Sequence, residues 1–105
     1  PGKFFTRDLD DIRVKGKNEP IKIFELMRPE ILPQEDLMKE LIGNFEEGRL
    51  AYAKQSWQKA EDHFKQCLKI RSDDGPAQLY LRRIESYKTS SPGEEWDGVY
   101  TFTTK

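Results

Sequence analysis

The sequence predicts a mostly helical fold, in which an N-terminal β-hairpin precedes three helices and an aromatic C-terminal tail. Two observations predict it: apolar residues alternate near the N-terminus, and they recur at helical spacing farther along the chain. The length of 105 residues fits one small domain, or a small domain with an appendage. We divide the chain into a hairpin at 1–28, a linker at 29–36, a helical module at 37–90 and a tail at 91–105.

Two strands around a turn account for residues 9–27. Ile12 and Val14 share one face of the first strand, because strand side chains alternate with a period of two. The turn is a Gly-Lys-Asn-Glu-Pro segment at 16–20, and the strand after it is apolar on both faces, so it needs cover on two sides. Because an isolated two-stranded hairpin is marginal in water, we expect this one to join a larger sheet or to borrow a partner.

The apolar period becomes helical after the linker at 29–36, which carries two prolines. Apolar residues spaced by three, four and seven predict a helix over about 37–54. A second helix, capped by Ser56, should extend to about Arg71, and a third should span about 76–88 with a proline in its first turn. The very short turn between the first two helices predicts antiparallel packing.

Composition excludes several functional classes. The chain has 18 Lys and Arg residues against 19 Asp and Glu residues, which gives a net charge of −1. No positive electrostatic field is therefore expected that would attract a nucleic-acid backbone or an anionic membrane. No apolar stretch approaches the ~18 residues that span a bilayer, and no signal segment opens the chain, so we expect a soluble cytoplasmic protein. The single Cys67 and single His63 exclude a disulfide framework and a cysteine-based zinc site, and we expect both to be packing residues.

The two longest predicted helices carry a spaced set of small and aromatic residues. Gly48 and Ala60 would let the helices approach closely, Phe64 would fill the groove between them, and Cys67 would add a small packing residue. This spacing resembles a tetratricopeptide repeat, whose pattern is W-x2-L-G-x2-Y, then A-x3-F, then P. The departures from that pattern are Asn44, Glu47, Ala51 and Ser72. We therefore expect one degenerate repeat of this type, with the third helix as a cap.

The hairpin has its own resemblance. Its turn region reads Arg-Val-Lys-Gly-Lys at 13–17 and its second strand reads Ile-Lys-Ile-Phe-Glu-Leu at 21–26. This order resembles the closing hairpin of the catalytic domain of class III adenylate/guanylate cyclases. The helical extension and the Trp-Asp-Gly-Val at 96–99 also resemble the segment C-terminal to that domain in some bacterial cyclases. Together with a start at Pro1 rather than at methionine, this predicts a C-terminal fragment of such an enzyme.

The resemblance implies that the reaction centre lies elsewhere. In class III cyclases the active site forms between two catalytic domains, where two aspartates hold Mg²⁺ or Mn²⁺, and by resemblance those residues lie upstream of Pro1. We expect no catalytic residue, metal or cofactor in the fragment, whereas the parent would form cyclic AMP and pyrophosphate from ATP, or cyclic GMP from GTP. Lys15 occupies the position of a lysine that contacts the ATP triphosphate, where a cation on a tight turn neutralises phosphate charge. The alternative is that Lys15 is a solvated turn lysine.

Other clusters have structural interpretations. We expect Asp8, Asp10 and Asp11 to form a charged strand edge rather than a metal site. Four aromatic residues at helical spacing are expected in the core rather than on a stacking platform: Trp57, Phe64, Tyr80 and Tyr87.

The fragment is therefore predicted to be a regulatory or assembly region of a cyclase in signal transduction, acting through self-association or another protein contact. Any membrane anchor of the parent would lie upstream. The tail should pack on the helices, in cis or exchanged with a second copy, through Trp96, Val99, Tyr100 and Phe102. The alternative is a stand-alone tetratricopeptide-like adaptor, in which a groove beside Tyr52 and the third helix receives a peptide. A third interpretation is an unrelated helical adaptor with an accidental hairpin resemblance.

Overall fold

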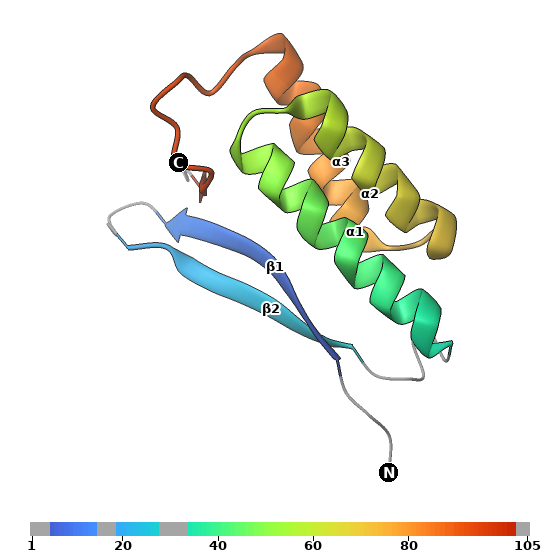
Figure 1. Cartoon of the computed structure of the whole chain (residues 1–105). Coiled ribbons are helices and arrows are strands. Elements are labelled where there is room, and N and C mark those ends of the chain that lie inside the picture. The colour runs from blue at the N-terminus through green and yellow to red at the C-terminus, as the bar shows by residue number, and fades with distance from the viewer. Residues whose placement is uncertain (1–4, 15–18, 28–33, 103–105) are drawn as a thin grey trace.

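The computed structural model describes residues 5–14, 19–27 and 34–102. A two-stranded antiparallel hairpin precedes three helices, as the sequence predicts, and the fold is mostly helical (Figure 1). The elements are β1 (Phe5–Val14), β2 (Ile21–Met27), α1 (Glu35–Ala53), α2 (Trp57–Ile70), α3 (Gly75–Thr89) and β3 (Tyr100–Phe102). The predicted linker at 29–36 lies largely outside the described residues, which resume at Gln34.

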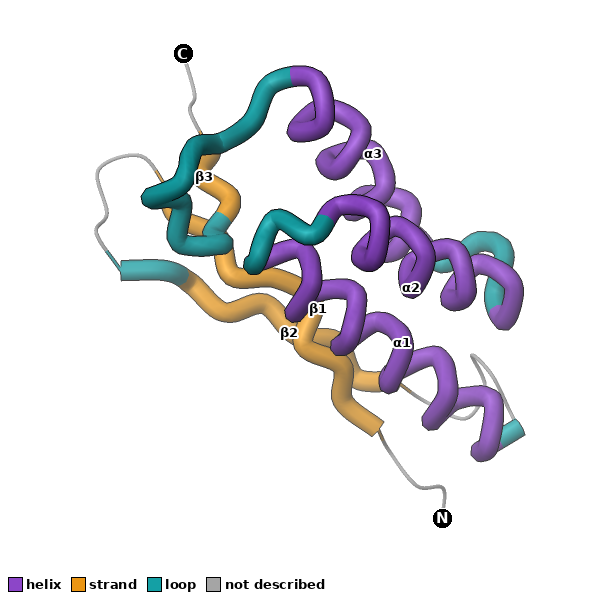
Figure 2. Tube along the Cα trace, turned by 45° about the horizontal axis from the view of Figure 1, so that its top comes forward, coloured by secondary structure: helices purple, strands orange, loops and turns teal. Residues whose placement is uncertain are grey.

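The three strands form one sheet in the order β2-β1-β3. β1 pairs antiparallel with β2, and the end of β1 pairs in parallel with β3, from Ile12 opposite Tyr100 to Val14 opposite Phe102. Figure 2 shows the C-terminal segment returning from α3 to lie beside β1. The hairpin thus obtains a third strand from the tail of its own chain, which the aromatic composition of the tail did not identify as a strand.

In the described part of the chain, helices cover one face of the hairpin and leave the other face open. Met27 is fully buried against the helical core, whereas Phe24 and Leu26 are exposed. The second strand is apolar on both faces as predicted, but the described residues cover only one of them. A bulge at Leu9 interrupts the β1–β2 register between Asp8 and Asp10, and it changes which β1 side chains point to the helices.

The helix boundaries follow local chemistry. α1 begins at Glu35, two residues before the predicted start, and its acidic first turn of Glu35 and Asp36 complements the positive end of the helix dipole. Gln55 has a φ of 63° and closes the turn that makes α2 antiparallel to α1. Ser56 is the N-cap residue of α2, but its side chain makes no capping hydrogen bond. Asp74 does cap α3, by accepting a hydrogen bond from the Ala77 amide.

The helices and the hairpin share one core. Phe45 of α1, Phe64 of α2 and Tyr80 of α3 meet there, with ring centroids 4.8–5.5 Å apart. Met27 of β2 belongs to the same cluster, and Phe5 and Leu9 of β1 pack against it. No helix in the described part of the chain has the length and apolar character needed to cross a membrane.

Candidate functional site

The turn that carries Lys15 lies outside the described residues, so the structure gives no position for its side chain. The strand that leads into this turn is described up to Val14. The candidate site is therefore the surface where β1 meets the helices, which we call the hairpin–helix interface. Its polar core consists of Arg7, Asp10, Asp74, Tyr80 and Arg83.

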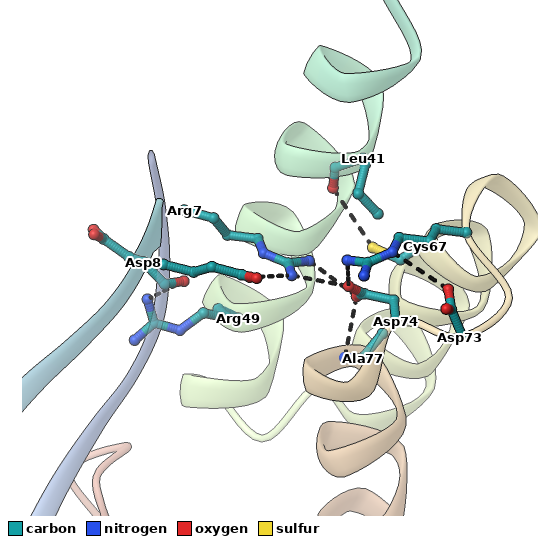
Figure 3. Close-up of polar contacts among 10 residues, drawn as sticks. Arg7, Asp8, Leu41, Arg49, Cys67, Asp73, Asp74 and Ala77 are labelled. Carbon is teal, nitrogen blue, oxygen red and sulfur yellow. Dashed lines mark hydrogen bonds and ion pairs between the residues drawn. The ribbon is translucent and has the colours of Figure 1, made fainter. Parts of the chain in front are cut away.

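A buried ion pair joins β1 to the start of α3 (Figure 3). Arg7 donates to both carboxylate oxygens of Asp74, from Nη1 to Oδ2 at 2.9 Å and from Nη2 to Oδ1 at 2.8 Å. The Arg7 and Asp74 side chains are 1% and 0% exposed, and Arg7 Nη2 also donates to Glu25 of β2 at 2.7 Å. The Arg7 guanidinium lies 4.6 Å from the centre of the Phe45 ring on α1. One side chain thus connects two strands and two helices.

The Asp74 carboxylate has two further partners besides Arg7. Its Oδ2 accepts the Ala77 amide of the first turn of α3, and its Oδ1 lies 3.4 Å from Nη1 of Arg71. Burial alone would lower the pKa of the Arg7 guanidinium, but its hydrogen bonds with Asp74 and Glu25 outweigh burial and raise that pKa. Arg7 therefore keeps its positive charge in the interior, and the loss of Asp74 would leave that buried charge without its main partner.

A second polar cluster joins β1 to the middle of α3. Arg83 Nη2 lies 2.9 Å from Oδ2 of Asp10. The Tyr80 hydroxyl donates to the Leu9 carbonyl oxygen at 2.7 Å and lies 3.0 Å from Oδ1 of Asp10. The prediction that Asp10 belongs to a charged strand edge is therefore wrong, because β1 is the central strand and Asp10 is buried. The bulge at Leu9 turns Asp10 inward, where burial of its charge is compensated by Arg83 and Tyr80.

The other two aspartates of this segment remain nearer to solvent. Asp11 forms ion pairs with Arg49 of α1 at 3.2 Å and with Lys22 of β2 at 3.7 Å. Asp8 is exposed, and its carbonyl oxygen accepts a hydrogen bond from Arg49. Within the described ranges, no group of three or more His, Cys, Asp or Glu side chains is arranged to hold a metal ion.

The tail covers the far end of the interface. Trp96 packs on Tyr52, Trp57 and Tyr87 with ring centroids 5.2–6.0 Å apart, and its Nε1 donates to the Val99 carbonyl oxygen at 3.0 Å. The tail therefore packs in cis, and Trp96 occupies the space beside Tyr52 where a peptide groove was considered.

Two further contacts connect the tail to β1 and α3, and one more tail side chain is buried. Val99 is buried. The Tyr100 ring lies 4.0 Å from the Arg83 guanidinium. Asp97 forms an ion pair with Arg13 at 2.9 Å, and this contact helps to lower the pKa of the Asp97 carboxyl. Phe102 lies in β3, and its side chain is outside the described part of the structure.

The proposed helix-packing residues are all buried: Gly48, Ala60, Phe64 and Cys67. A Cβ atom built on Gly48 would lie 2.9 Å from the Phe64 ring, so only glycine permits this approach of α1 to α2. The Cys67 sulfur donates to the Leu41 carbonyl oxygen at 3.6 Å, and burial raises the pKa of the Cys67 thiol to about 12. His63 Nδ1 lies 3.0 Å from Asn44 Oδ1, a partly buried polar contact between α2 and α1.

The sequence did not identify the Arg7–Asp74 pair. Asp74 had a readable signal, since an Asp two residues before Pro76 is typical of an N-cap. Arg7 had none, because 67 residues separate the partners and Arg7 precedes the strand that the sequence pattern predicts from residue 9. Arg83 is likewise one of many charged residues on its helix, and only the fold shows that it is buried.

Comparison with known proteins gives one informative similarity. The chain is 28% identical over 88 residues to the adenylate cyclase "terminal-differentiation specific" of Dictyostelium discoideum. The match covers 83% of this chain but 4% of that protein. No family model matches the sequence, and no solved structure matches it. The alignment is too long to involve the hairpin alone, so the similarity to this adenylate cyclase extends into the helical part.

Proposed function

We propose that this chain is the C-terminal regulatory or assembly region of a class III adenylate cyclase. The hairpin sequence, the order of hairpin and helices, and the similarity to the Dictyostelium adenylate cyclase support the proposal. Under this proposal the catalytic residues lie outside the region. Conversion of ATP to cyclic AMP, with its Mg²⁺ or Mn²⁺ ions, would belong to residues outside it.

The observation that carries the proposal is the buried Arg7–Asp74 pair. It connects the strand that precedes Lys15 to the N-terminus of α3. Asp10–Arg83 adds a second connection nearer to the turn, and the β1–β3 pairing adds a third that reaches Val14. Because buried, well-packed contacts shift as units and not gradually, a displacement of the helices would move the Lys15 turn. The helices would thereby set the position of a cation at the ATP triphosphate.

The helical part is proposed to be of tetratricopeptide type. The close approach at Gly48, with Ala60 and Phe64 buried opposite α1, supports this assignment. Arrays of such repeats usually need about three units to bury their apolar faces. In this chain the hairpin and the tail would take the place of such further repeats, since Met27 and Trp96 pack with the helical core.

The experiment uses the full-length protein that contains this chain. Lys15→Ala should lower the rate of cyclic AMP synthesis. Asp74→Asn should lower it as well, although Asp74 caps α3 and is far along the chain from the turn. Asp73→Asn is the matched control, since the Asp73 side chain is 83% exposed. Cyclic AMP synthesis unaffected by Asp74→Asn in a folded protein would contradict coupling, and an upstream sequence without the metal-binding aspartates would contradict a cyclase.

Assembly is tested separately by light scattering over a dilution series of the chain. A persistent dimer would support an assembly role. A monomer at all concentrations would limit the proposal to regulation within one chain.

A further inference from the structure

A groove runs along the side of α3 that faces the hairpin. It consists of two adjoining hollows of about 420 and 460 Å³, which share Leu79, Arg82 and Arg83 as lining residues. The first hollow lies between α3 and the hairpin, where Ile12 and Ile23 line it. The second continues along α3, and its further lining residues are Ser86, Tyr87 and Tyr100. We call the two together the α3 groove.

Apolar side chains remain uncovered in and beside this groove. Leu79 is 36% exposed, Ile23 is 37% exposed and Ile21 is 45% exposed. Ile21 and Ile23 point to the same face of β2 as Met27, because strand side chains alternate. Met27 is buried under the helices, whereas the isoleucines lie at the other end of the strand. The face of the sheet that the helices cover is therefore left partly open beside α3.

The charge of the groove is positive. Arg82 is exposed and has no ion-pair partner among the described residues. Arg83 is 8% exposed, and its Nη1 has no hydrogen-bond partner in the same part of the chain. The carboxylate in the groove, Asp10, is already engaged by Arg83 Nη2 and the Tyr80 hydroxyl. An acidic group from outside would therefore complement the groove.

The backbone of the groove favours a helix as its occupant. β2 pairs with one edge of β1, and at the other edge β3 pairs only with Ile12–Val14. The Tyr80 hydroxyl donates to the Leu9 carbonyl oxygen on that edge. The backbone groups of Leu9 and Ile12, which line the groove, therefore already have partners, and this disfavours the addition of a strand there. A helix that binds through its side chains can instead lie on the sheet beside α3, as helices do in layered folds. The groove follows α3 from Gly75 to Tyr87, which is about three helical turns at 1.5 Å per residue.

We propose that the α3 groove binds an amphipathic helix of a partner protein, with apolar residues on one face and a flanking carboxylate that pairs with Arg82. The apolar side chains fill the hollows beside Leu79 and Ile23. This inference depends only on the groove and holds whether or not the chain belongs to a cyclase.

The test begins with a phage library of amphipathic helices of about 15 residues, whose flanking positions vary among Glu, Gln and Lys. Selection on the immobilised chain should enrich Glu beside the apolar face. Addition of the selected peptide to ¹⁵N-labelled chain should shift the amide resonances of α3 and of residues 9–12. Enrichment of Lys, absence of any binder, or shifts confined to another surface would overturn the proposal. The same shifts on raising the protein concentration without peptide would assign the groove to a second copy, and would overturn it too.

Two variants and a control refine the test. Leu79→Asp should weaken peptide binding about tenfold or more, because it places a charge in the apolar contact. Arg82→Glu should weaken it up to about fivefold, as expected for a pair near solvent, and a peptide with Lys in place of the flanking Glu should restore binding. Lys59→Glu, an exposed change on α2, should leave the affinity unchanged. Equal loss in all three variants would show non-specific charge attraction and would contradict the groove.

Discussion

Asp74 has two structural roles, because one carboxylate both caps α3 and neutralises Arg7. Replacement by Asn keeps the shape and an oxygen acceptor but removes the charge. We expect Asp74→Asn to lower the free energy of unfolding by about 3 kcal/mol, since it leaves a buried guanidinium with less compensation. Urea unfolding followed by circular dichroism measures the change in the free energy of unfolding. Asp73→Asn, in the exposed neighbouring position, should change stability by less than about 0.5 kcal/mol, and equal effects of the two substitutions would contradict a buried pair.

Cys67 connects stability to pH. Burial raises the pKa of its thiol to about 12, whereas an unfolded cysteine has a pKa of about 8.5. The folded state therefore binds the proton more tightly, so the stabilisation is complete below about pH 8.5 and is lost as the pH rises towards 12. Between pH 8 and pH 10 the free energy of unfolding should fall by about 2 kcal/mol more for the native chain than for the Cys67→Ala variant. Parallel pH profiles of the two proteins would show that the thiol is not buried in the folded state.

At the scale of elements, the contact between α1 and α2 depends on Gly48. Ala in place of Gly favours a helix by about 1 kcal/mol, but at Gly48 the added methyl would meet the Phe64 ring at 2.9 Å. We expect Gly48→Ala to destabilise the fold by about 1–3 kcal/mol through overpacking. Gly43 is on the same helix with open space around its Cα, so Gly43→Ala should be neutral or stabilising. Thermal unfolding of both variants measures the difference, and a stabilising Gly48→Ala would contradict the close approach.

The tail is held mainly by Trp96. This side chain packs on three aromatic residues of the helices while Asp97 pairs with Arg13 of β1. We expect Trp96→Ala to lower the free energy of unfolding by about 2 kcal/mol, less than for a fully buried tryptophan because Trp96 is half-buried. Glu94→Ala, at an exposed position of the same segment, is the control for differential scanning calorimetry. An unchanged melting temperature in the Trp96 variant would mean that the tail does not pack in cis.

The sequence predicted the elements better than their contacts. Periodicity identified the hairpin and the three helices to within a few residues, because buried faces impose a repeating pattern on a chain. The strand β3 was missed, since a run of aromatic and β-branched residues can pack on helices as readily as it can pair. Asp10 was assigned to a charged strand edge, but β1 is the central strand and Asp10 pairs with Arg83, which is distant in sequence. Arg7, Asp74 and Arg83 are distant in sequence, and no local pattern joins them.

At the scale of the whole molecule, we expect the hairpin and the helices to form one cooperative unit. β1 is attached along its length, by Arg7 to α3, by Asp10 to Arg83, and by β3 beyond Ile12. A two-stranded hairpin without these contacts would open independently of the helices. The coupling proposed for the cyclase requires that the hairpin does not open independently of the helices.

Native-state hydrogen exchange tests this cooperativity most directly. The paired β1 amides of residues 7–12 should exchange with the same opening free energy as the core amides of α3, and Asp74→Asn should lower both values together. The account would be contradicted if the α3 amides were protected while the β1 amides exchanged near the rate of an unstructured chain. The hairpin and the helices would then not be a single cooperative unit, and the helices could transmit nothing to the hairpin.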